Sequence, residues 1–252
     1  MKKIFFFSFL CAIIFSACDD GTDSTDPVDD VFKGVKLEQT GVLSLSMNHT
    51  FNAEVFSLGK NYVTAQNDTV NFDKFRYYIS NISLQDVNGK WVNLGNYSLL
   101  DLDVPTKHKI TLNNVPAANY VKMSFLVGVD SVANFSGAQT GELDPSYGMY
   151  WTWATGYIFF RLNGRYNGNR PLSFDLGGNN NLPRIELDFS TFKIKGNNLT
   201  VNTEFNLASI FHSPHDYKLS SQNDDMHSAT SPGAPLLKDN IQVGCFNITD
   251  IK

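Results

Sequence analysis

The chain has 252 residues, a formal net charge of −5 and 42% hydrophobic residues. This length suits one well-packed domain and is short for two. The sequence holds no stripe of basic residues, which argues against nucleic acid as a partner.

Residues 1–18 have the pattern of an export signal. Two lysines follow Met1, residues 4–17 are almost wholly apolar, and Phe-Ser-Ala precedes Cys18. The apolar run is too short to span a bilayer comfortably, so we expect a signal peptide rather than a transmembrane helix. Its end resembles a bacterial lipobox, in which Cys18 is acylated and becomes the new N-terminus. The alternative is a simple secretory signal cut near Ala17. Both interpretations place the protein in the cell envelope, and the lipid would make it an outer-membrane lipoprotein, periplasmic or surface-exposed.

Residues 19–33 are expected to form an acidic, flexible tether. Six of the twelve residues from Asp19 to Asp30 are aspartate, and most of the others are Gly, Ser, Thr or Pro. Such a composition cannot bury a core. Directly after a lipidated cysteine, the tract also resembles the surface-export signal of Bacteroidetes lipoproteins; a solvated linker without that role is the alternative. Residues 34–252 then form a single domain.

The three cysteines do not predict a disulfide. Cys11 leaves with the signal and Cys18 is expected to carry the lipid, so Cys245 stands alone. Its strand-like surroundings predict a small core residue.

Beyond the tether, the sequence predicts strands almost throughout. Asn88-Gly89 separates two strand-like runs and indicates a hairpin. Helical periodicity is scarce: residues 134–153 look loop-like with one short helix, residues 205–211 could hold a single turn, and residues 214–240 form a long irregular excursion, a kind of segment that is often functional. We therefore predict an all-β fold, an antiparallel β-sandwich or Greek-key barrel with long loops. The expected strands are 42–46, 72–84, 99–104, 108–112, 121–127, 172–176, 184–189, 192–194, 199–205 and 241–248.

Soft metal ligands are the most informative chemical groups in the chain. Imidazole and thioether suit copper, and the absence of paired thiolates argues against structural zinc. Met47 and His49 lie at i and i+2, so on a strand both project from one face. A surface or hydrogen-bonded role is the alternative for every histidine, and it is the preferred interpretation of His108. The candidate ligands are Met47, His49, His212, His215 and His227.

Two other kinds of site find less support. Asp130, Asn134 and Asp144 could offer oxygen ligands to Ca²⁺, but turn capping explains them better. No nucleophile motif or acid–base pair is visible, so we do not expect an enzyme.

Trp151 and Trp153 also lie at i and i+2, within an aromatic run from Tyr147 to Tyr157. Two neighbouring indoles on one face of a strand, each with an N–H that needs a partner, are unusual for a core. They form either a large aromatic wall or part of a functional site.

Several motifs occur together in a fixed order. They are Phe75-Arg-Tyr-Tyr-Ile-Ser80, Pro116-Ala-Ala-Asn-Tyr120, Phe125-Leu-Val-Gly-Val-Asp130, Met149-Tyr-Trp-Thr-Trp153 and Phe174-Asp-Leu-Gly-Gly178. As a set they resemble the MbnP family, copper-binding proteins associated with methanobactin gene clusters, and its Bacteroidetes lipoprotein relatives. The resemblance covers most of the chain from Lys36 to Ile248.

The resemblance implies an exported β-sandwich that binds copper. It further implies that a tryptophan is oxidised to kynurenine by a partner di-haem enzyme of the cytochrome c peroxidase type, after which its nitrogen can join histidines around the metal. Trp151 and Trp153 match the aromatic motif, His49 matches a histidine of an N-terminal strand, and His227 is a looser match to a loop histidine. Asp175 stands where the family often carries histidine, which would alter the site if that histidine is a ligand.

A surface module that binds glycan or protein without a metal is the alternative function. In it, Trp151 and Trp153 would form an exposed stacking platform.

Overall fold

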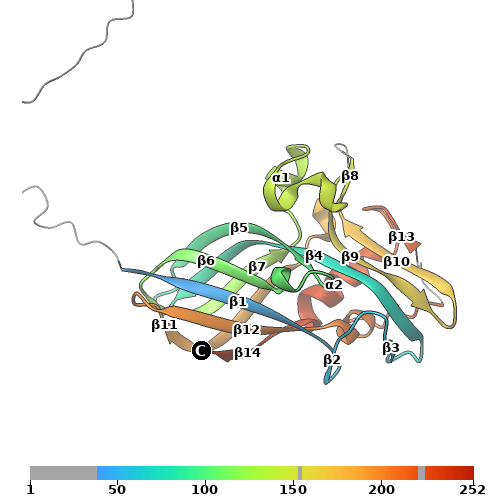
Figure 1. Ribbon diagram of the computed structural model, residues 1–252, viewed down its shortest axis with the longest axis horizontal. Coiled ribbons are helices and arrows are strands. Elements are labelled where there is room, and N and C mark those ends of the chain that lie inside the picture. The colour runs from blue at the N-terminus through green and yellow to red at the C-terminus, as the bar shows by residue number, and fades with distance from the viewer. Residues whose placement is uncertain (1–38, 153–154, 221–224) are drawn as a thin grey trace, which may run out of the picture. The chain divides into compact units, whose positions relative to one another are not determined.

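Two packed β-sheets make up the described part of the chain, which comprises residues 39–152, 155–220 and 225–252 of this computed structural model (Figure 1). The first sheet contains β14 (Phe246–Ile251), β12 (Asn198–Asn206), β1 (Thr40–Phe51) and β2 (Glu54–Val55), with β6 (Lys109–Pro116) paired to β1. The second contains β11 (Arg184–Lys193), β7 (Asn119–Val127), β4 (Thr69–Asp86), β9 (Gly156–Tyr166), β10 (Arg170–Gly177) and β13 (Asp225–Met226). β3 (Asn61–Val63) and β5 (Trp91–Asp101) pair with β4, and β8 (Tyr150–Thr152) pairs with β9. The all-β prediction is confirmed. The predicted signal and tether, with Cys18, and Trp153 lie outside the described residues.

Most neighbouring strands are antiparallel, as expected, but two pairs are parallel. β1 and β12 run parallel from Val42 opposite Asn198 to Thr50 opposite Asn206, and β10 and β13 are parallel over two residues. Parallel strands need a long connection, and nearly the whole second sheet lies between β1 and β12 in the chain. Hydrophobic alternation carries no information on strand direction, so the sequence could not show these two pairs.

Alternating side chains of the long strands fill the space between the sheets. On β1, every second residue from Leu43 to Phe51 is buried. On β4, Phe75 and Tyr77 belong to the same core, whereas Tyr78 belongs to a second cluster on the other side of its sheet. β4 is therefore covered on both faces.

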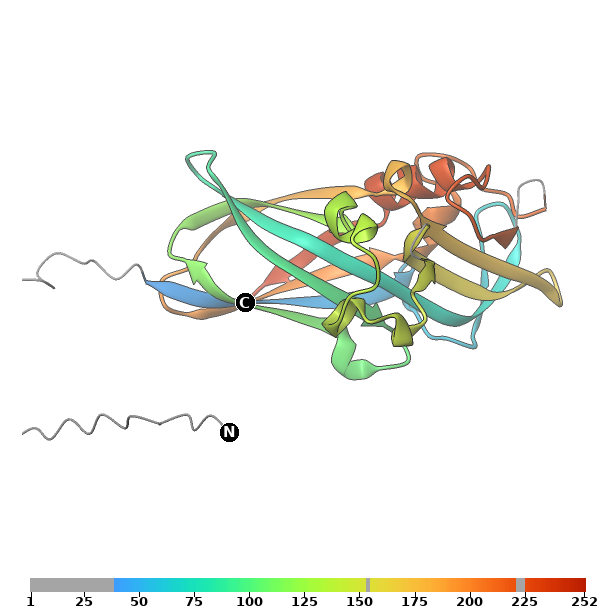
Figure 2. The same cartoon turned by 90° about the horizontal axis from the view of Figure 1, so that it is seen from above.

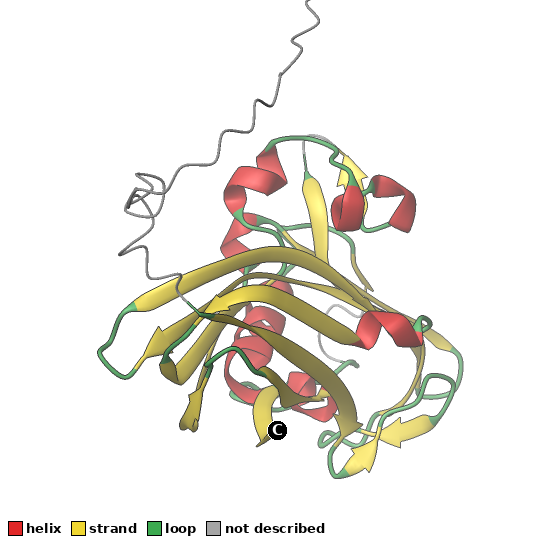
Figure 3. Ribbon diagram, turned by 60° about the vertical axis from the view of Figure 1, so that its left-hand side comes forward, coloured by secondary structure: helices red, strands yellow, loops and turns green. Residues whose placement is uncertain are grey.

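The outer face of the second sheet is covered by residues 131–152. This excursion holds α1 (Ser131–Phe135), η2 (Gly141–Leu143), η3 (Pro145–Tyr147) and β8. Figure 2 shows it lying across β4 and β5, and Figure 3 shows its short helices standing beyond the strands. Leu143 and Met149 pack with Tyr78 and Tyr157 in the second buried cluster. The region is loop-like as expected, but it holds one short α-helix, two 3-10 turns and a short strand where the sequence predicted one short helix.

The C-terminal region differs from the sequence-based expectation. α2 (Ala234–Gly244) precedes β14, so the strand predicted over residues 241–248 is wrong for residues 241–244. Pro235 suits the first turn of a helix, and the buried residues Ala234, Leu237 and Ile241 recur at helical spacing. The apolar residues at 241 and 243 fit strand alternation equally well. η5 (Leu207–Phe211), the single turn expected here, packs against α2. Two further short turns are η1 (Pro105–His108) and η4 (Asn179–Asn181).

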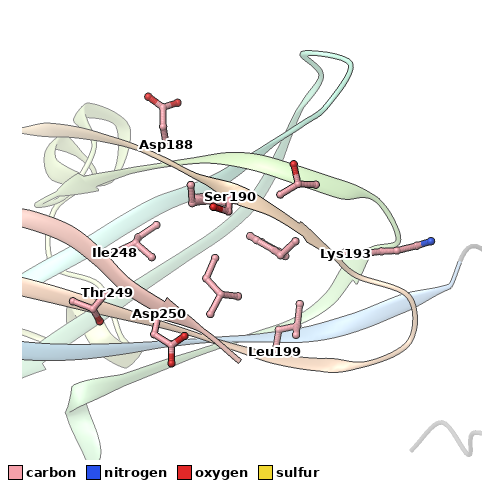
Figure 4. Close-up of a pocket in the computed structure, with 11 residues that line it drawn as sticks. Asp188, Ser190, Lys193, Leu199, Ile248, Thr249 and Asp250 are labelled. Carbon is pink, nitrogen blue, oxygen red and sulfur yellow. The ribbon is translucent and has the colours of Figure 1, made fainter.

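The edge strands β11 and β14 leave a seam between the two sheets. A bulge between Asp188 and Phe192 interrupts the pairing of β11 with β7, and a cavity of about 710 Å³ opens there (Figure 4). Its half-buried apolar lining consists of Phe189, Leu199, Ile248 and Ile251. Because none of the predicted site residues lines it, this cavity is separate from the candidate site.

In the described ranges, every helix is too short or too polar to cross a membrane.

Candidate metal site

β1 places Met47 and His49 side by side on the inner face of the first sheet. Both are buried, with His49 only 8% exposed. The Nε2 atom of His49 lies 2.8 Å from the hydroxyl oxygen of Tyr77, which reaches it from β4 in the other sheet. The Sδ atom of Met47 accepts a hydrogen bond from the Thr203 hydroxyl at 2.9 Å. The strand alternation that the sequence indicated thus brings two soft donors to one place.

His108 also lies here, although it is not among the candidate ligands of the sequence analysis, which preferred a surface or hydrogen-bonded role for it. η1 turns the chain so that the rings of His49 and His108 meet edge to face, with centroids 5.8 Å apart. The Nε2 atom of His108 lies 3.2 Å from the carbonyl oxygen of Asp101 and donates to it in the tautomer that leaves Nδ1 unprotonated. No local pattern could have paired two histidines so distant in the chain, because the contact depends on the pairing of β1 with β6, which begins at the residue after His108.

Met47, His49 and His108 line one pocket of about 700 Å³. Its remaining walls are mixed: Val55, Phe56, Leu58 and Leu102 are apolar, and Asn48, Thr50, Ser57 and Asp103 are polar.

The imidazole of His49 is electrically neutral at neutral pH. Burial lowers its pKa from 6.5 to about 3, and the charge of His108 acts in the same direction. A neutral ring keeps a lone pair for a metal ion, so no proton has to be displaced before binding.

The geometry fits a soft ion of low coordination number. Two imidazoles that share one ion through bonds of about 2.0–2.1 Å have ring centroids at most ~6 Å apart, and the observed separation is 5.8 Å. Both Nε2 atoms are engaged, which leaves the two Nδ1 atoms. Across the described residues, no group of three or more His, Cys, Asp or Glu side chains could hold an ion. The soft donors that share this pocket are two imidazoles and a thioether.

His227 lies on the other side of the second sheet. Its Nδ1 atom is 3.3 Å from Asp175 Oδ2 and its Nε2 atom is 2.7 Å from Asp225 Oδ1. Asp175 alternates with Phe174 and Leu176, which face the core, so Asp175 and His227 face outward. His49 contacts the core face of the same sheet through Tyr77. The structure therefore does not bring His49 and His227 together, and one ion cannot bind both.

Asp175, which stands where the family resemblance suggested histidine, is an ion-pair partner. Its two carboxylate oxygens accept from Arg161 Nε and Nη2, each at 2.6 Å, and its side chain is buried. Opposite Arg161 on β4 lies Arg76, whose Nε is 2.9 Å from Asp101 Oδ2. The two acids and the two guanidinium groups thus form one row of side chains across neighbouring strands, on the outer face of the sheet.

The two arginines also hold the excursion onto the sheet. Nη1 of Arg76 donates to the carbonyl of Tyr147 at 2.9 Å, and Nη1 of Arg161 donates to the carbonyl of Gly148 at 2.7 Å. These carbonyls lie at the start of the aromatic run that contains Trp151. We call this arrangement of two arginines, their acidic partners and the two carbonyls the arginine clamp. The sequence analysis did not identify it, because it joins β4, β5, β9, β10 and a loop.

Trp151 lies against β10 beside the arginine clamp. A Cβ atom added to Gly177 would come within 2.7 Å of the Trp151 ring, so the indole packs directly on the glycine backbone and is partly buried. Gly177 follows Asp175 by two residues on the same strand. Trp151, which contacts Gly177, and His227, which contacts Asp175, therefore both lie beside that strand. Trp153 lies outside the described residues.

His212 and His215 lie near α2. His212 directly follows η5, and the Nε2 atom of His215 is 3.2 Å from Asp239 Oδ2 on the helix. Neither lines the pocket of Met47, His49 and His108. Cys245 is buried, its thiol donates to the Asn240 carbonyl at 3.4 Å, and burial raises its pKa, as suits a small core residue.

The side-chain oxygens of Asp130, Asn134 and Asp144, which the sequence analysis considered as Ca²⁺ ligands, accept hydrogen bonds from backbone amides. Asp130 Oδ1 caps α1 by accepting from the amides of Val132 and Ala133. Asn134 Oδ1 accepts from the amide of Tyr157 at 2.7 Å. Asp144 Oδ1 accepts from the amide of Ser146. Capping therefore accounts for Asp130 and Asp144, whereas Asn134 ties α1 to β9 through the long-range bond to Tyr157.

The buried histidine predicts a loss of stability in mild acid. Above pH 6.5 the ring is neutral in both the folded and unfolded states; below it, the unfolded ring gains a proton that the folded ring refuses until about pH 3. The free energy of unfolding should fall by up to ~1.4 kcal/mol per pH unit in that window. Urea unfolding at about pH 7 and pH 4.5 should show a smaller drop for His49→Gln than for the native protein. His215→Gln is the control, and an equal drop in all three proteins would contradict the assignment.

The arginine clamp predicts a large effect of a small substitution. Asp175→Asn leaves the Arg161 guanidinium without its counter-charge and should cost roughly 3 kcal/mol of unfolding free energy. Amide hydrogen exchange of residues 147–150 should accelerate, because the Gly148 carbonyl loses an oriented donor. Asp239→Asn, in a half-exposed ion pair, should cost below about 1 kcal/mol. Similar costs for both variants would show that the clamp is unimportant.

The comparisons with known proteins agree with this architecture. The family model described as MbnP matches residues 40–229, more than half of the chain. A solved structure of MbnP from Methylosinus trichosporium superimposes with a TM-score of 0.55 and 16% sequence identity, covering 79% of this chain and 87% of that one. At this identity the structural match shows a shared fold. No curated protein matches the sequence. The family match over residues 40–229 establishes that the chain belongs to the MbnP family.

Proposed function

We propose that this protein is an exported lipoprotein that binds copper between His49 and His108, with Met47 beside them, and that it performs no catalytic turnover. The observation that carries the proposal is the pair of imidazole rings with centroids 5.8 Å apart, at a pocket that also exposes a thioether. The copper-binding character that the family resemblance implies supports it.

The chemistry of the pocket favours Cu(I). His49 is neutral, because burial lowers its pKa to about 3, and Met47 supplies sulfur. Cu(I) accepts two or three soft donors, whereas harder divalent ions need more oxygen or nitrogen ligands than this pocket holds.

Export follows from the N-terminal sequence. Basic residues, a short apolar run and small residues before Cys18 support a lipid anchor in the cell envelope. The acidic residues 19–33 would then separate the copper-binding domain from the membrane.

We further propose that a tryptophan of the Trp151–Trp153 pair is oxidised by a di-haem partner enzyme. Trp151 packs on Gly177 beside Asp175 and His227, on the opposite face of the sheet from His49. A nitrogen created on Trp151 would therefore lie near His227 and would not reach the pocket of His49 and His108.

The copper site is tested by Cu(I) competition against a chromophoric chelator, with the full mature protein free of affinity tags. The native protein should bind one Cu(I) with sub-micromolar affinity, and His108→Gln should weaken binding at least about tenfold, the loss typical of a changed metal shell. His227→Gln is the matched control and should bind as the native protein does. Absence of a sub-micromolar site would refute the proposal, and sensitivity to His227 in place of His108 would move the site to the outer face.

Tryptophan oxidation is tested by peptide mass spectrometry. In protein purified from its own host, the peptide containing Trp151 and Trp153 should show the mass of a tryptophan-to-kynurenine conversion. The same peptide from protein made without the di-haem enzyme serves as the reference and should carry unmodified tryptophan. An unmodified peptide from the host would exclude this part of the proposal.

A further inference from the structure

We propose that Tyr77 is the positioning residue of the copper site, because its hydroxyl occupies Nε2 of His49 and leaves Nδ1 as the ring nitrogen that binds the ion. The inference rests on the proposed copper site and specifies which atom of His49 acts there. The hydrogen bond between Nε2 and the Tyr77 hydroxyl, at 2.8 Å, is the observation behind it.

Tyr77 is held firmly enough for this task. Its side chain is fully buried on the central strand β4, and burial raises its pKa, so the hydroxyl keeps its proton. Aromatic rings surround it with centroids between 5.2 and 6.4 Å away. They belong to Phe75, Phe160, Phe205 and Phe246. Packing of this density fixes a side chain in one rotamer, and the hydroxyl therefore has a fixed position.

The contact with Tyr77 is compatible with either neutral tautomer of His49, because a phenol hydroxyl can donate or accept. Only the tautomer with its proton on Nε2, donated to the Tyr77 oxygen, would leave the lone pair of Nδ1 for an ion. The Tyr77 oxygen supplies the acceptor that this tautomer needs, and binding through Nδ1 would leave the ring neutral.

Removal of the hydroxyl should weaken copper binding. Without the Tyr77 oxygen, the metal-bound state must bury the Nε2 hydrogen with no acceptor, whereas the metal-free state can keep its proton on Nδ1 at the pocket. The cost therefore falls on the bound state. Substitution of residues that orient a metal-bound histidine typically lowers affinity 10–100-fold.

Tyr78 offers a matched control in the next position of the same strand. It is as deeply buried as Tyr77 but faces the outer cluster. Its hydroxyl has no hydrogen-bond partner among the described residues. Tyr78→Phe thus deletes the same atom from the same strand without removing a bond.

The experiment compares Cu(I) affinity of the native protein, Tyr77→Phe and Tyr78→Phe in full mature form. Tyr77→Phe should bind about 10–100-fold more weakly, and Tyr78→Phe should match the native protein. Thermal unfolding of the metal-free variants verifies that each is folded. In the ¹⁵N-histidine NMR spectrum of the Cu(I)-loaded native protein, His49 should carry its proton on Nε2, a signature that a merely structural role would not produce.

The outcomes separate the two ideas. Native-like affinity of Tyr77→Phe, or a proton on Nδ1 of His49 in the loaded protein, would overturn the role of Tyr77 while the copper site stands. Absence of Cu(I) binding by the native protein would overturn both.

Discussion

Burial of both faces of β4 is the constraint on which the rest of the structure depends. A strand alternates its side chains between two faces, and here each face meets a packed layer. Tyr77 points inward to His49, and Arg76, one residue earlier, points outward to Asp101 and the Tyr147 carbonyl. One strand thus supports two polar arrangements that cannot mix, because the sheet itself lies between them.

Each arrangement meets the cost of burying polar groups in a different way. On the inner face, His49 avoids the cost by remaining neutral and by sharing one hydrogen bond with Tyr77. On the outer face, Asp175 and Arg161 stay charged and compensate each other through a two-bond contact. Such buried ion pairs often add little net stability relative to apolar residues. The role of this pair is better explained by positioning, because Arg161 also binds the Gly148 carbonyl and so holds the start of the aromatic run in place.

The sequence predicted the local features well and the distant contacts poorly. Period-two alternation placed Met47 and His49 on one face, and the Asn88-Gly89 turn appears between β4 and β5, with Gly89 at a φ of +84°. Alternation also misled, because Ile241 and Val243 suit a strand although Pro235 begins a helix there. A surface or hydrogen-bonded role was the preferred interpretation of His108, and His227 was favoured by its loose match to a loop histidine of the family. His108 meets His49 because β6, which begins at the next residue, pairs with β1, and no single window of sequence contains both strands.

The outer face therefore carries a different chemistry from the one the family resemblance suggested. Both carboxylate oxygens of Asp175 are used by Arg161, and one of them also faces Nδ1 of His227. The other ring nitrogen of His227 faces Asp225. A metal ion at this place would have to displace a cation that already compensates a buried carboxylate, at a cost of several kcal/mol. The inner pair of imidazoles has no such ion pair to displace: each Nε2 atom has one neutral hydrogen-bond partner, the Tyr77 hydroxyl or the Asp101 carbonyl. The two faces of one sheet thus differ in charge, with neutral histidine contacts on the inside and the arginine clamp and Trp151 on the outside.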